Sequence, residues 1–321
     1  MTAIDDPAMP GRAAYAVADA LLTQRGRSFH WARRLLSALH AERATRLYGF
    51  CRRVDDVADE ARSTIEAQAE LTVIRDALET GQTDDLGVRD MLELMQGSGI
   101  HPSIPLELIR GVEGDLGTVR MADMDELLRY CYRVAGTVGL MMTAALDVTA
   151  PEALPHAIDL GIAMQLTNIC RDVREDALQD RRYLPATLVG TLEPASLVDP
   201  DDAAREIARR ALGTLLDLAD RFYSSGENGL RYLPPGARVG ILVAARTYRS
   251  IGVVLRRRDF DCWSSRAIVG TGRKTMITLG ALLDTVDPRQ ADAALAPKAY
   301  PQRSPGHRSD PAWSTEAGRA D

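Results

Sequence analysis

The sequence predicts an all-α protein, and two observations support that prediction. Apolar residues recur at three- and four-residue spacing over long stretches, which is typical of amphipathic helices. Alternating apolar and polar runs, the pattern of strands, are scarce. The chain has 321 residues, 45% of them hydrophobic, so it is long enough to bury a large core. We therefore expect a helical bundle.

Helix-capping residues and prolines place the helices in order along the chain. The stretch Ser63-Thr64-Ile65-Glu66 has the form of a capping box, which predicts a helix from here to Gly81. Asp123 is an N-cap before a run from Met124 to about Leu146. Later helices are expected to begin near Pro151 and Pro155, at Pro200-Asp201, and after Pro234-Pro235-Gly236, the last of them running through Asp259.

No internal linker separates two compositional halves, so we expect one domain. Residues 1–20 are expected to form a flexible N-terminus and residues 21–287 the helical domain. Residues 288–321 mix Pro, Ala, Ser and both charge signs without apolar periodicity, which predicts a disordered tail.

Composition argues against several classes of function. A net charge of −6 disfavours a nucleic-acid surface, because phosphate backbones are held by a surplus of Lys and Arg. The four cysteines form no CxxC pair, so neither a zinc site nor a disulfide framework is expected. The N-terminus has no apolar signal block, and the longest uncharged run, Val134 to Leu146, falls short of the ~20 residues that span a bilayer. We expect a cytoplasmic protein.

The stretch "DDVAD" places three carboxylates within five residues. On a helix, Asp55 and Asp59 share one face, whereas Asp56 points elsewhere. Arg52 and Tyr48 lie on the same face as Asp55, one and two turns toward the N-terminus. The first cluster is therefore expected to form a polar stripe on one helix.

A second stretch, "QLTNICRDVRED", has the same spacing. Its polar stripe is formed by Gln165, Asn168, Asp172 and Asp176. Both stripes are surrounded by apolar residues, so a solvated outer face is a poor explanation for them. A single DxxxD on a helix is more often a solvated face or a cap, but two such matches in apolar surroundings favour a binding site.

Desolvated like charges need compensating cations. Ligands that are all oxygen select hard ions, and carboxylates with an amide match Mg²⁺ or Mn²⁺. Because Mg²⁺ is usually shared between a few carboxylates and substrate phosphates, two facing aspartate stripes predict a diphosphate site. Supplementary donors are expected from Arg52, Arg171, Arg266, Arg273 and Lys274.

The stretch "VAGTVG" carries Gly136 and Gly139, and each costs a helix roughly 1 kcal/mol relative to Ala. Glycines at this spacing allow either a ligand chain or a neighbouring helix to approach the backbone. With Leu140, Met141 and Met142 following, the segment could line an apolar tunnel. An apolar cavity beside a metal–diphosphate site indicates a prenyl diphosphate substrate.

These motifs resemble those of the squalene and phytoene synthases, which join two prenyl diphosphates head to head. "YGFCRRVDDVADE" is similar to their first aspartate motif and "QLTNICRDVREDALQDRRYLP" to their second. "RYCYRVAGTVGLMM" and "AARTYRSI" are most similar to the phytoene synthase branch. The resemblance spans about Ser28 to Ala281, although His30 follows Ser28-Phe29 where the family commonly has Tyr or Ser.

The resemblance implies one helical bundle of the isoprenoid synthase type around a central apolar cavity, with aspartates on opposite walls. Three Mg²⁺ or Mn²⁺ ions would be held by Asp55, Asp59, Asn168, Asp172 and Asp176. The diphosphate or the reacting chain would contact Ser28, Phe29, Tyr48, Arg52, Gln165, Asn168, Arg171, Tyr183, Tyr248 and Arg266. The catalytic set would be Asp55, Asp59, Asp172, Asp176, Tyr48, Arg52 and Tyr248.

The implied reaction begins as metal and arginine stabilise a departing diphosphate, which leaves an allylic cation in a dry cavity. Attack by the second chain gives a cyclopropylcarbinyl diphosphate, whose ionisation, rearrangement and proton loss yield phytoene. Tyrosine hydroxyls or the released diphosphate accept that proton. No NADPH is expected, because the chain has no GxGxxG motif following a strand.

Three alternative functions share part of this pattern. A squalene or dehydrosqualene synthase would use two farnesyl diphosphates in place of two geranylgeranyl diphosphates. A head-to-tail elongating synthase would share DDxxD, but the second cluster, with Glu175 in fourth place, does not fit its pattern. A non-catalytic assembly protein of this fold would be expected to lose aspartates that are present here.

Because the substrates are lipids, we also expect peripheral contact with the inner membrane face and contact with downstream carotenoid enzymes.

Overall fold

The computed structural model describes residues 10–24 and 26–286, of which 76% are helical, and the all-α prediction is confirmed. The first third of the chain forms α1 (Pro10–Gln24), α2 (Arg27–Arg33), α3 (Ala38–Glu60), α4 (Thr64–Thr80), α5 (Leu86–Ser98) and α6 (Ser103–Gly114). The middle forms β1 (Val119–Arg120), α7 (Met124–Cys131), the π-helix η1 (Tyr132–Gly136), α8 (Thr137–Ala145), α9 (Ala153–Arg171), α10 (Val173–Leu178) and β2 (Arg181–Arg182). The remainder forms α11 (Ala186–Val189), α12 (Ala195–Val198), α13 (Asp202–Gly229), the 3₁₀-helix η2 (Leu230–Tyr232), α14 (Pro235–Arg257) and α15 (Thr271–Val286).

The predicted capping residues are present at the N-termini of α4, α7 and α13. The Ser63 hydroxyl accepts from the Glu66 N–H, and the Asp123 carboxylate accepts from the Glu126 N–H. Gly81 ends α4 in the left-handed conformation, with φ of 72°. The helix expected over residues 124–146 contains one π-helical turn, η1, between α7 and α8.

The domain boundary predicted at residue 21 falls inside α1. This helix packs against α3 through buried Ala18 and Leu22. Gly49 of α3 permits the approach, since a Cβ there would lie 2.6 Å from the Ala18 Cβ. Residues 10–20 are therefore helical, while residues 1–9 and the expected tail at 288–321 lie outside the described residues.

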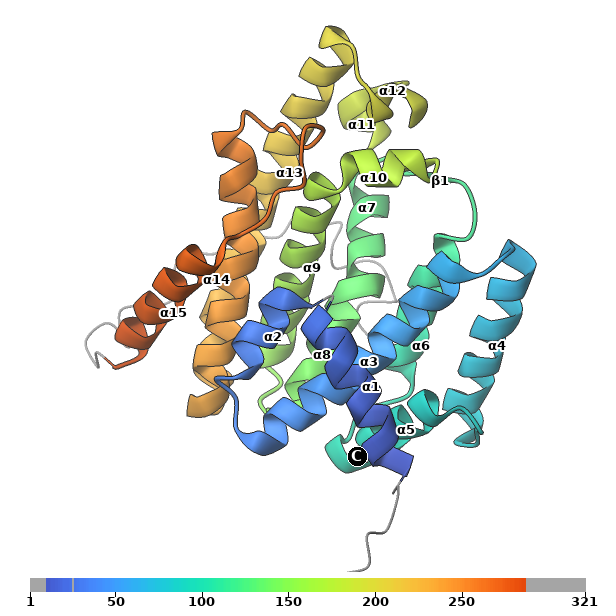
Figure 1. The fold of residues 1–321 in the computed structure, drawn as a ribbon, viewed down its shortest axis with the longest axis vertical. Coiled ribbons are helices and arrows are strands. Elements are labelled where there is room, and N and C mark those ends of the chain that lie inside the picture. Colours follow the sequence, from blue (N-terminus) through green and yellow to red (C-terminus); the bar gives the residue numbers. More distant parts are fainter. Residues whose placement is uncertain (1–9, 25, 287–321) are drawn as a thin grey trace, which may run out of the picture.

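Helix α9 is the centre of the bundle. It contacts α7, η1, α8, α13 and α14, and runs beside α13 and α14 (Figure 1). One core cluster surrounds α9 and α13, and a second joins α3 to α4, α5 and α6. Within the described residues, no helix combines the length and apolar content needed to cross a membrane.

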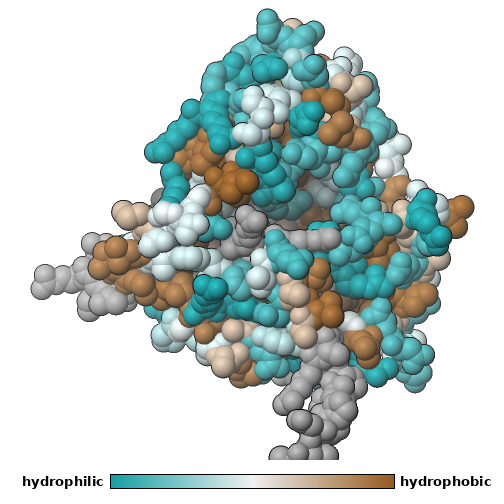
Figure 2. Space-filling model, in the orientation of Figure 1, coloured by the Kyte–Doolittle hydropathy of each residue, from teal (hydrophilic) through white to brown (hydrophobic). Residues whose placement is uncertain are grey.

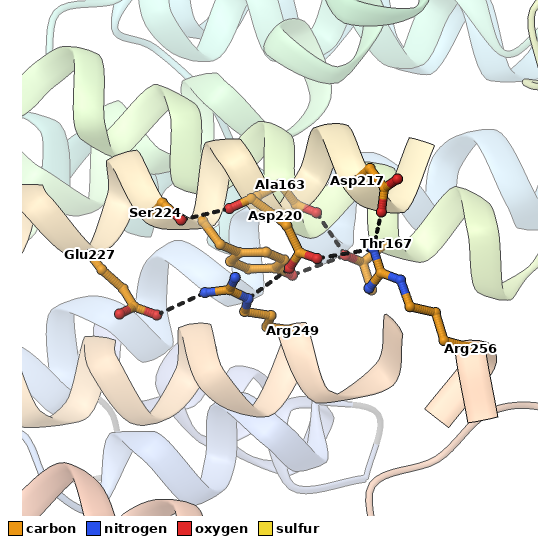
Figure 3. A network of polar contacts seen from close by, with 9 residues as sticks. Ala163, Thr167, Asp217, Asp220, Ser224, Glu227, Arg249 and Arg256 are labelled. Carbon is orange, nitrogen blue, oxygen red and sulfur yellow. Dashed lines mark hydrogen bonds and ion pairs between the residues drawn. The ribbon is translucent and has the colours of Figure 1, made fainter. Parts of the chain in front are cut away.

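Polar contacts fix α13 between α9 and α14 (Figure 3). On one side, the hydroxyls of Tyr223 and Thr167 are 3.0 Å apart and buried. On the other side, Arg249 Nε donates to Asp220 Oδ1 at 2.7 Å and Arg256 Nη2 donates to Asp217 Oδ1 at 2.8 Å. Because Arg249 faces α13, the orientation of α14 is set, and with it that of the neighbouring Tyr248.

Glycines allow α9 to cross α8 and η1 at very short range. A Cβ at Gly161 would lie 2.2 Å from the Ala135 carbonyl oxygen, and one at Gly139 would lie 2.2 Å from that of Ala157. The structure therefore shows the tight helix crossing that was one of the two interpretations of "VAGTVG", with α8 and η1 crossing α9. Gly139 and Gly161 also line the apolar cavity described below.

We expect Gly161→Ala to lower the free energy of unfolding by about 1–3 kcal/mol, because the added methyl meets backbone that cannot move aside. Gly97→Ala is the matched control, because nothing lies within 4 Å of a Cβ there and φ is not positive. In urea unfolding the control should be neutral or more stable by about 0.5–1 kcal/mol. Equal midpoints for the two variants would contradict the packing account.

Candidate active site

A polar pocket of about 170 Å³ lies where α3 faces the end of α9. Helix α3 contributes Asp55 and Asp59, so both carboxylates of the first cluster line it. The opposite wall contributes Gln165, Asn168, Asp172 and Asp176. The structure thus brings the two predicted stripes together from segments more than a hundred residues apart.

The second stripe is divided between two helices. Helix α9 ends at Arg171, and Asp172 follows with φ of −106° and ψ of 17°. The Asp172 carbonyl still accepts from the Asp176 N–H at 2.8 Å, so α10 continues from the same turn. The sequence predicted one uninterrupted stripe, but the bend at Asp172 places its carboxylate at the end of one helix and that of Asp176 in the first turn of the next.

Asp172 is the carboxylate that two arginines neutralise. Arg266 Nε and Nη2 donate to its two oxygens at 2.9 and 3.0 Å, and Arg171 forms a second bidentate pair. Burial alone would raise the pKa of Asp172, but these hydrogen bonds and charges outweigh burial and lower it. Asp172 therefore stays ionised.

Asp55 and Asp176 have no such partners. Burial raises the pKa of Asp55 to about 7, with smaller contributions from the neighbouring charges of Asp59, Asp56 and Asp115, and a partly opposing one from Arg52. Burial raises the pKa of Asp176 to about 8, and the charge of Asp172 raises it further. Two partly buried carboxylates that resist ionisation indicate a site whose positive charge is supplied by a ligand.

Arg52 and Arg181 compensate part of the first cluster. Arg52 pairs with Asp56, the carboxylate expected to point elsewhere, and its Nη2 lies 4.0 Å from Asp59 Oδ2. Arg181 Nη1 lies 3.6 Å from Asp59 Oδ1 and so links the two walls. The shortest printed contact of Arg52 is therefore its i, i+4 pair with Asp56, and its contact with Asp59 is longer.

Three polar residues of the pocket lie outside the predicted set: Asp115, Tyr130 and Arg181. The hydroxyls of Tyr183 and Tyr130 donate to Asp115 at 2.6 and 3.0 Å. Burial raises the pKa of Asp115, although these hydrogen bonds and Arg181 act in the opposite direction. Parallel pairing of β1 with β2, with Val119 opposite Arg181, brings these segments together. Of the three, Arg181 lies within the second motif and Tyr130 within "RYCYRVAGTVGLMM", whereas Asp115 lies in no quoted motif and had no sequence signal.

An apolar cavity of about 420 Å³ opens from the polar pocket, and the two share Asp55, Gln165 and Asn168. Its aromatic wall is Phe29, whose ring centre lies 6.4 Å from that of Tyr48 and 5.1 Å from that of Tyr248. Arg52 also lines it, whereas Tyr183 lines only the polar pocket. Ser28 belongs to α2, and its side chain is not among those described.

The donor set fits divalent ions shared with a phosphate ligand. The amide oxygen of Asn168 is buried, lines the pocket and accepts no hydrogen bond. Among the described residues, no three Asp, Glu, His or Cys side chains converge into a complete protein cage. Carboxylates around an open pocket are the arrangement in which Mg²⁺ keeps positions for water and substrate phosphate.

Comparison with known proteins identifies the family. The family model for squalene/phytoene synthase matches residues 22–273. The chain belongs to the squalene/phytoene synthase family. It is 34% identical over 270 residues to a phytoene synthase of Pseudescherichia vulneris, covering 79% of this chain and 86% of that one. It is 32% identical to a phytoene synthase of Rhodobacter capsulatus, covering 89% of this chain and 86% of the relative.

Solved structures share the fold of this family member. A dehydrosqualene synthase in complex with a ligand matches with a TM-score of 0.76 at 24% identity, covering 87% of this chain and 98% of that one. A squalene synthase of Alicyclobacillus acidocaldarius matches with a TM-score of 0.69 at 18% identity, covering 79% and 97%. The predicted isoprenoid synthase fold is confirmed.

The raised pKa values predict how stability depends on pH in metal-free protein. Unfolded aspartate titrates at about 4, so between there and about pH 8 the folded state holds more protons than the unfolded state. The free energy of unfolding therefore falls as the pH rises through this window. Asp176→Asn removes one ionisation, and we expect its Tm to exceed that of the wild type by about 2–4 °C at pH 8.

The same variant should show no gain at pH 4.5, where Asp176 is protonated in the folded protein. The exposed Glu152→Gln is the control and should not change Tm at either pH. A gain of equal size at both pH values would mean that burial does not hold the Asp176 proton.

Proposed function

We propose that the chain is a phytoene synthase. It condenses two geranylgeranyl diphosphates head to head, through a cyclopropylcarbinyl diphosphate, to phytoene, with release of two diphosphates for carotenoid biosynthesis. The observation that carries this proposal is the junction at Asp55, Gln165 and Asn168, where a carboxylate-lined pocket opens into an apolar cavity. Relatives named phytoene synthase, 32–34% identical over most of the chain, support the same activity.

Proteins of this family generally depend on divalent metals. We infer that Mg²⁺ or Mn²⁺, as three ions, is held by Asp55, Asp59, Asn168, Asp172 and Asp176 together with the substrate diphosphate. When bound, the metal neutralises charge that develops on the departing diphosphate. No nicotinamide cofactor is needed for phytoene.

The residues around the metal site have separate roles. Arg266, with its side chain 53% exposed, and the partly buried Arg171 hold Asp172 ionised before any ligand arrives. Asp115 holds the Tyr130 and Tyr183 hydroxyls, so that both rings wall the pocket in fixed positions. Preorganised charges and dipoles of this kind need no rearrangement as the leaving group departs.

The cavity residues exclude water and hold the prenyl chains. Phe29, Tyr48 and Tyr248 form an aromatic wall near the pocket, and burial raises the pKa of Tyr248. The neutral phenol is therefore the form present when a cationic chain passes it. The π face of a neutral ring stabilises nearby positive charge, which favours the aromatic wall over an aliphatic one.

Asp172→Asn should abolish turnover, by at least about 10³-fold in kcat, because its neutral amide leaves Arg171 and Arg266 without their carboxylate and removes a metal ligand. Far-ultraviolet circular dichroism should show little loss of helix. The exposed Glu175→Gln, within the same motif, is the control and should keep near-normal activity. Near-normal activity of Asp172→Asn would remove the metal-site argument.

Product analysis separates phytoene synthase from the alternative that acts on farnesyl diphosphate. With Mg²⁺ and equal amounts of farnesyl and geranylgeranyl diphosphates, without NADPH, we expect mass spectrometry of the hydrocarbon extract to show phytoene. A product of 30 carbons would identify the squalene or dehydrosqualene activity instead. Longer linear diphosphates in the aqueous phase would contradict head-to-head condensation.

We further propose that the protein is cytoplasmic and docks on the inner membrane face, where it exchanges lipid with downstream carotenoid enzymes. Helix α15 supports a docking role. It packs on α14 through Ala281 and is tied to α2 by the hydrogen bond from Trp31 to Thr278, while Met276, Leu279 and Leu283 on its outer face are 54–69% exposed (Figure 2). Both supporting helices line the cavity, so a bilayer here would adjoin the prenyl site.

The double variant Leu279→Glu with Leu283→Glu should reduce co-sedimentation with phospholipid vesicles at least about fivefold, because each charge would have to enter the lipid interface. The matched control is Ile65→Glu with Val73→Glu on α4, where both side chains are more than half exposed but lie away from the cavity. Equal vesicle binding by both double variants would contradict docking through α15.

A further inference from the structure

A buried polar group lies beside the apolar cavity, far from the metal site. His156 lines the cavity, and its Nδ1 lies 2.9 Å from Ser225 Oγ. The Ser225 hydroxyl donates to Asp159 Oδ2 at 2.5 Å. Ser225 is 1% exposed and Asp159 2% exposed. The reaction at the carboxylate pocket uses none of these three residues.

The hydrogen bonds fix the orientation of the imidazole. Ser225 has one hydroxyl proton and gives it to Asp159, so its oxygen accepts from His156 Nδ1–H. The serine is thereby committed to the carboxylate and is not activated by the histidine, which argues against a nucleophilic role. The arrangement is a support that holds the ring in one position and one tautomer.

Packing confirms the same position from the other side of the ring. A Cβ at Gly229 would lie 2.4 Å from the His156 Cβ, so α13 has room for this side chain only because Gly229 has none. The Tyr232 ring stacks on the imidazole at 6.2 Å with an interplanar angle of 19°. His156 is therefore held by contacts from α13 and η2 as well as by its hydrogen bonds.

The distance from the diphosphate pocket to His156 can be calculated from the rise of helix α9. Asn168 and His156 are twelve residues apart on α9, which corresponds to about 18 Å. An extended carbon chain advances about 1.3 Å per bond, so the 16-carbon main chain of a geranylgeranyl group spans about 19 Å and the 12-carbon main chain of a farnesyl group about 14 Å. The longer chain thus ends at the turn that carries His156, and the shorter one ends near Leu160.

We propose that His156, positioned by Ser225 and Asp159, is the residue that sets prenyl chain length by closing the cavity where a geranylgeranyl chain ends. The inference rests on the proposed function and adds its specificity determinant. A fixed ring with a polar edge stops a longer apolar chain. The apolar wall between Leu160 and His156 favours a chain that fills it over one that leaves it empty.

The test is competition among farnesyl, geranylgeranyl and geranylfarnesyl diphosphates with the full chain and Mg²⁺, with products measured by mass spectrometry. His156→Ala deepens the cavity and should raise the use of the C25 chain relative to C20 about tenfold. His156→Trp shortens the cavity and should raise C15 use relative to C20 by a similar factor. Ser225→Ala releases the ring and should shift the C25 ratio in the same direction as His156→Ala, by a smaller factor.

Two control variants remove an imidazole or a serine hydroxyl at positions outside this hydrogen-bonded group. His101→Ala removes an exposed imidazole, and Ser224→Ala removes the hydroxyl that donates to the Asp220 carbonyl on the same helix as Ser225. Neither should change the ratios. If the wild type makes phytoene but His156→Ala leaves the C25-to-C20 ratio unchanged, the role of His156 is overturned and the proposed function stands. If the alanine variant does not fold, an unchanged C15-to-C20 ratio in a folded His156→Trp gives the same answer. Absence of condensation by the wild type with every chain would overturn the proposed function and this inference with it.

Discussion

The burial of carboxylates beside too little positive charge is the constraint on which the site depends. Helix α3 brings Asp55 and Asp59 toward Asp172 and Asp176, and Asp115 approaches from the segment after α6. Burial raises the pKa of Asp55, Asp115 and Asp176, so assembling these groups without a cation works against folding. Asp172, by contrast, is held by two arginines, which lower its pKa. The pocket is therefore built to gain stability when positive charge enters it.

Rigid packing on both sides keeps the carboxylates opposed. Gly139 and Gly161 allow α8 and η1 to pack directly on α9, and the hydrogen bonds of Asp220 with Arg249 and of Tyr223 with Thr167 hold α13 and α14 in place. The same close crossings leave a cavity lined by small residues along α9. One set of packing contacts thus produces both the polar pocket and the apolar space into which it opens.

Much of this could be predicted from the sequence, because it depends on local spacing. Caps at Ser63 and Asp123 place helices, and three- and four-residue spacing identifies Asp55, Asp59 and Asn168 as facing the interior. Contacts between distant segments could not be predicted in this way. Local spacing gave no sign that Asp115 would meet Tyr183, because their contact depends on a two-residue parallel pairing between β1 and β2.

Helix ends and side-chain partners were also beyond local spacing. The end of α9 at Arg171 divides a stripe that is continuous in the sequence, and the Asp172 carboxylate at this point accepts hydrogen bonds from Arg171 and Arg266. Local spacing allowed Arg52 to pair with either Asp55 or Asp56, and it did not indicate that Asp56 would be the shortest contact. The packing of α1 on α3 through Ala18 depends on Gly49, a contact that composition at the N-terminus does not indicate.

The central claim is that two buried carboxylates keep their protons until a cation enters. It is tested most directly by following the carboxyl carbon resonances of ¹³C-labelled aspartate over pH in the metal-free protein, with Asp55→Asn and Asp176→Asn assigning the signals. The account predicts two carboxyls that titrate at about 7 and about 8, and that remain ionised to lower pH when Mg²⁺ is added. Titration of every aspartate below about pH 5 without metal would contradict it.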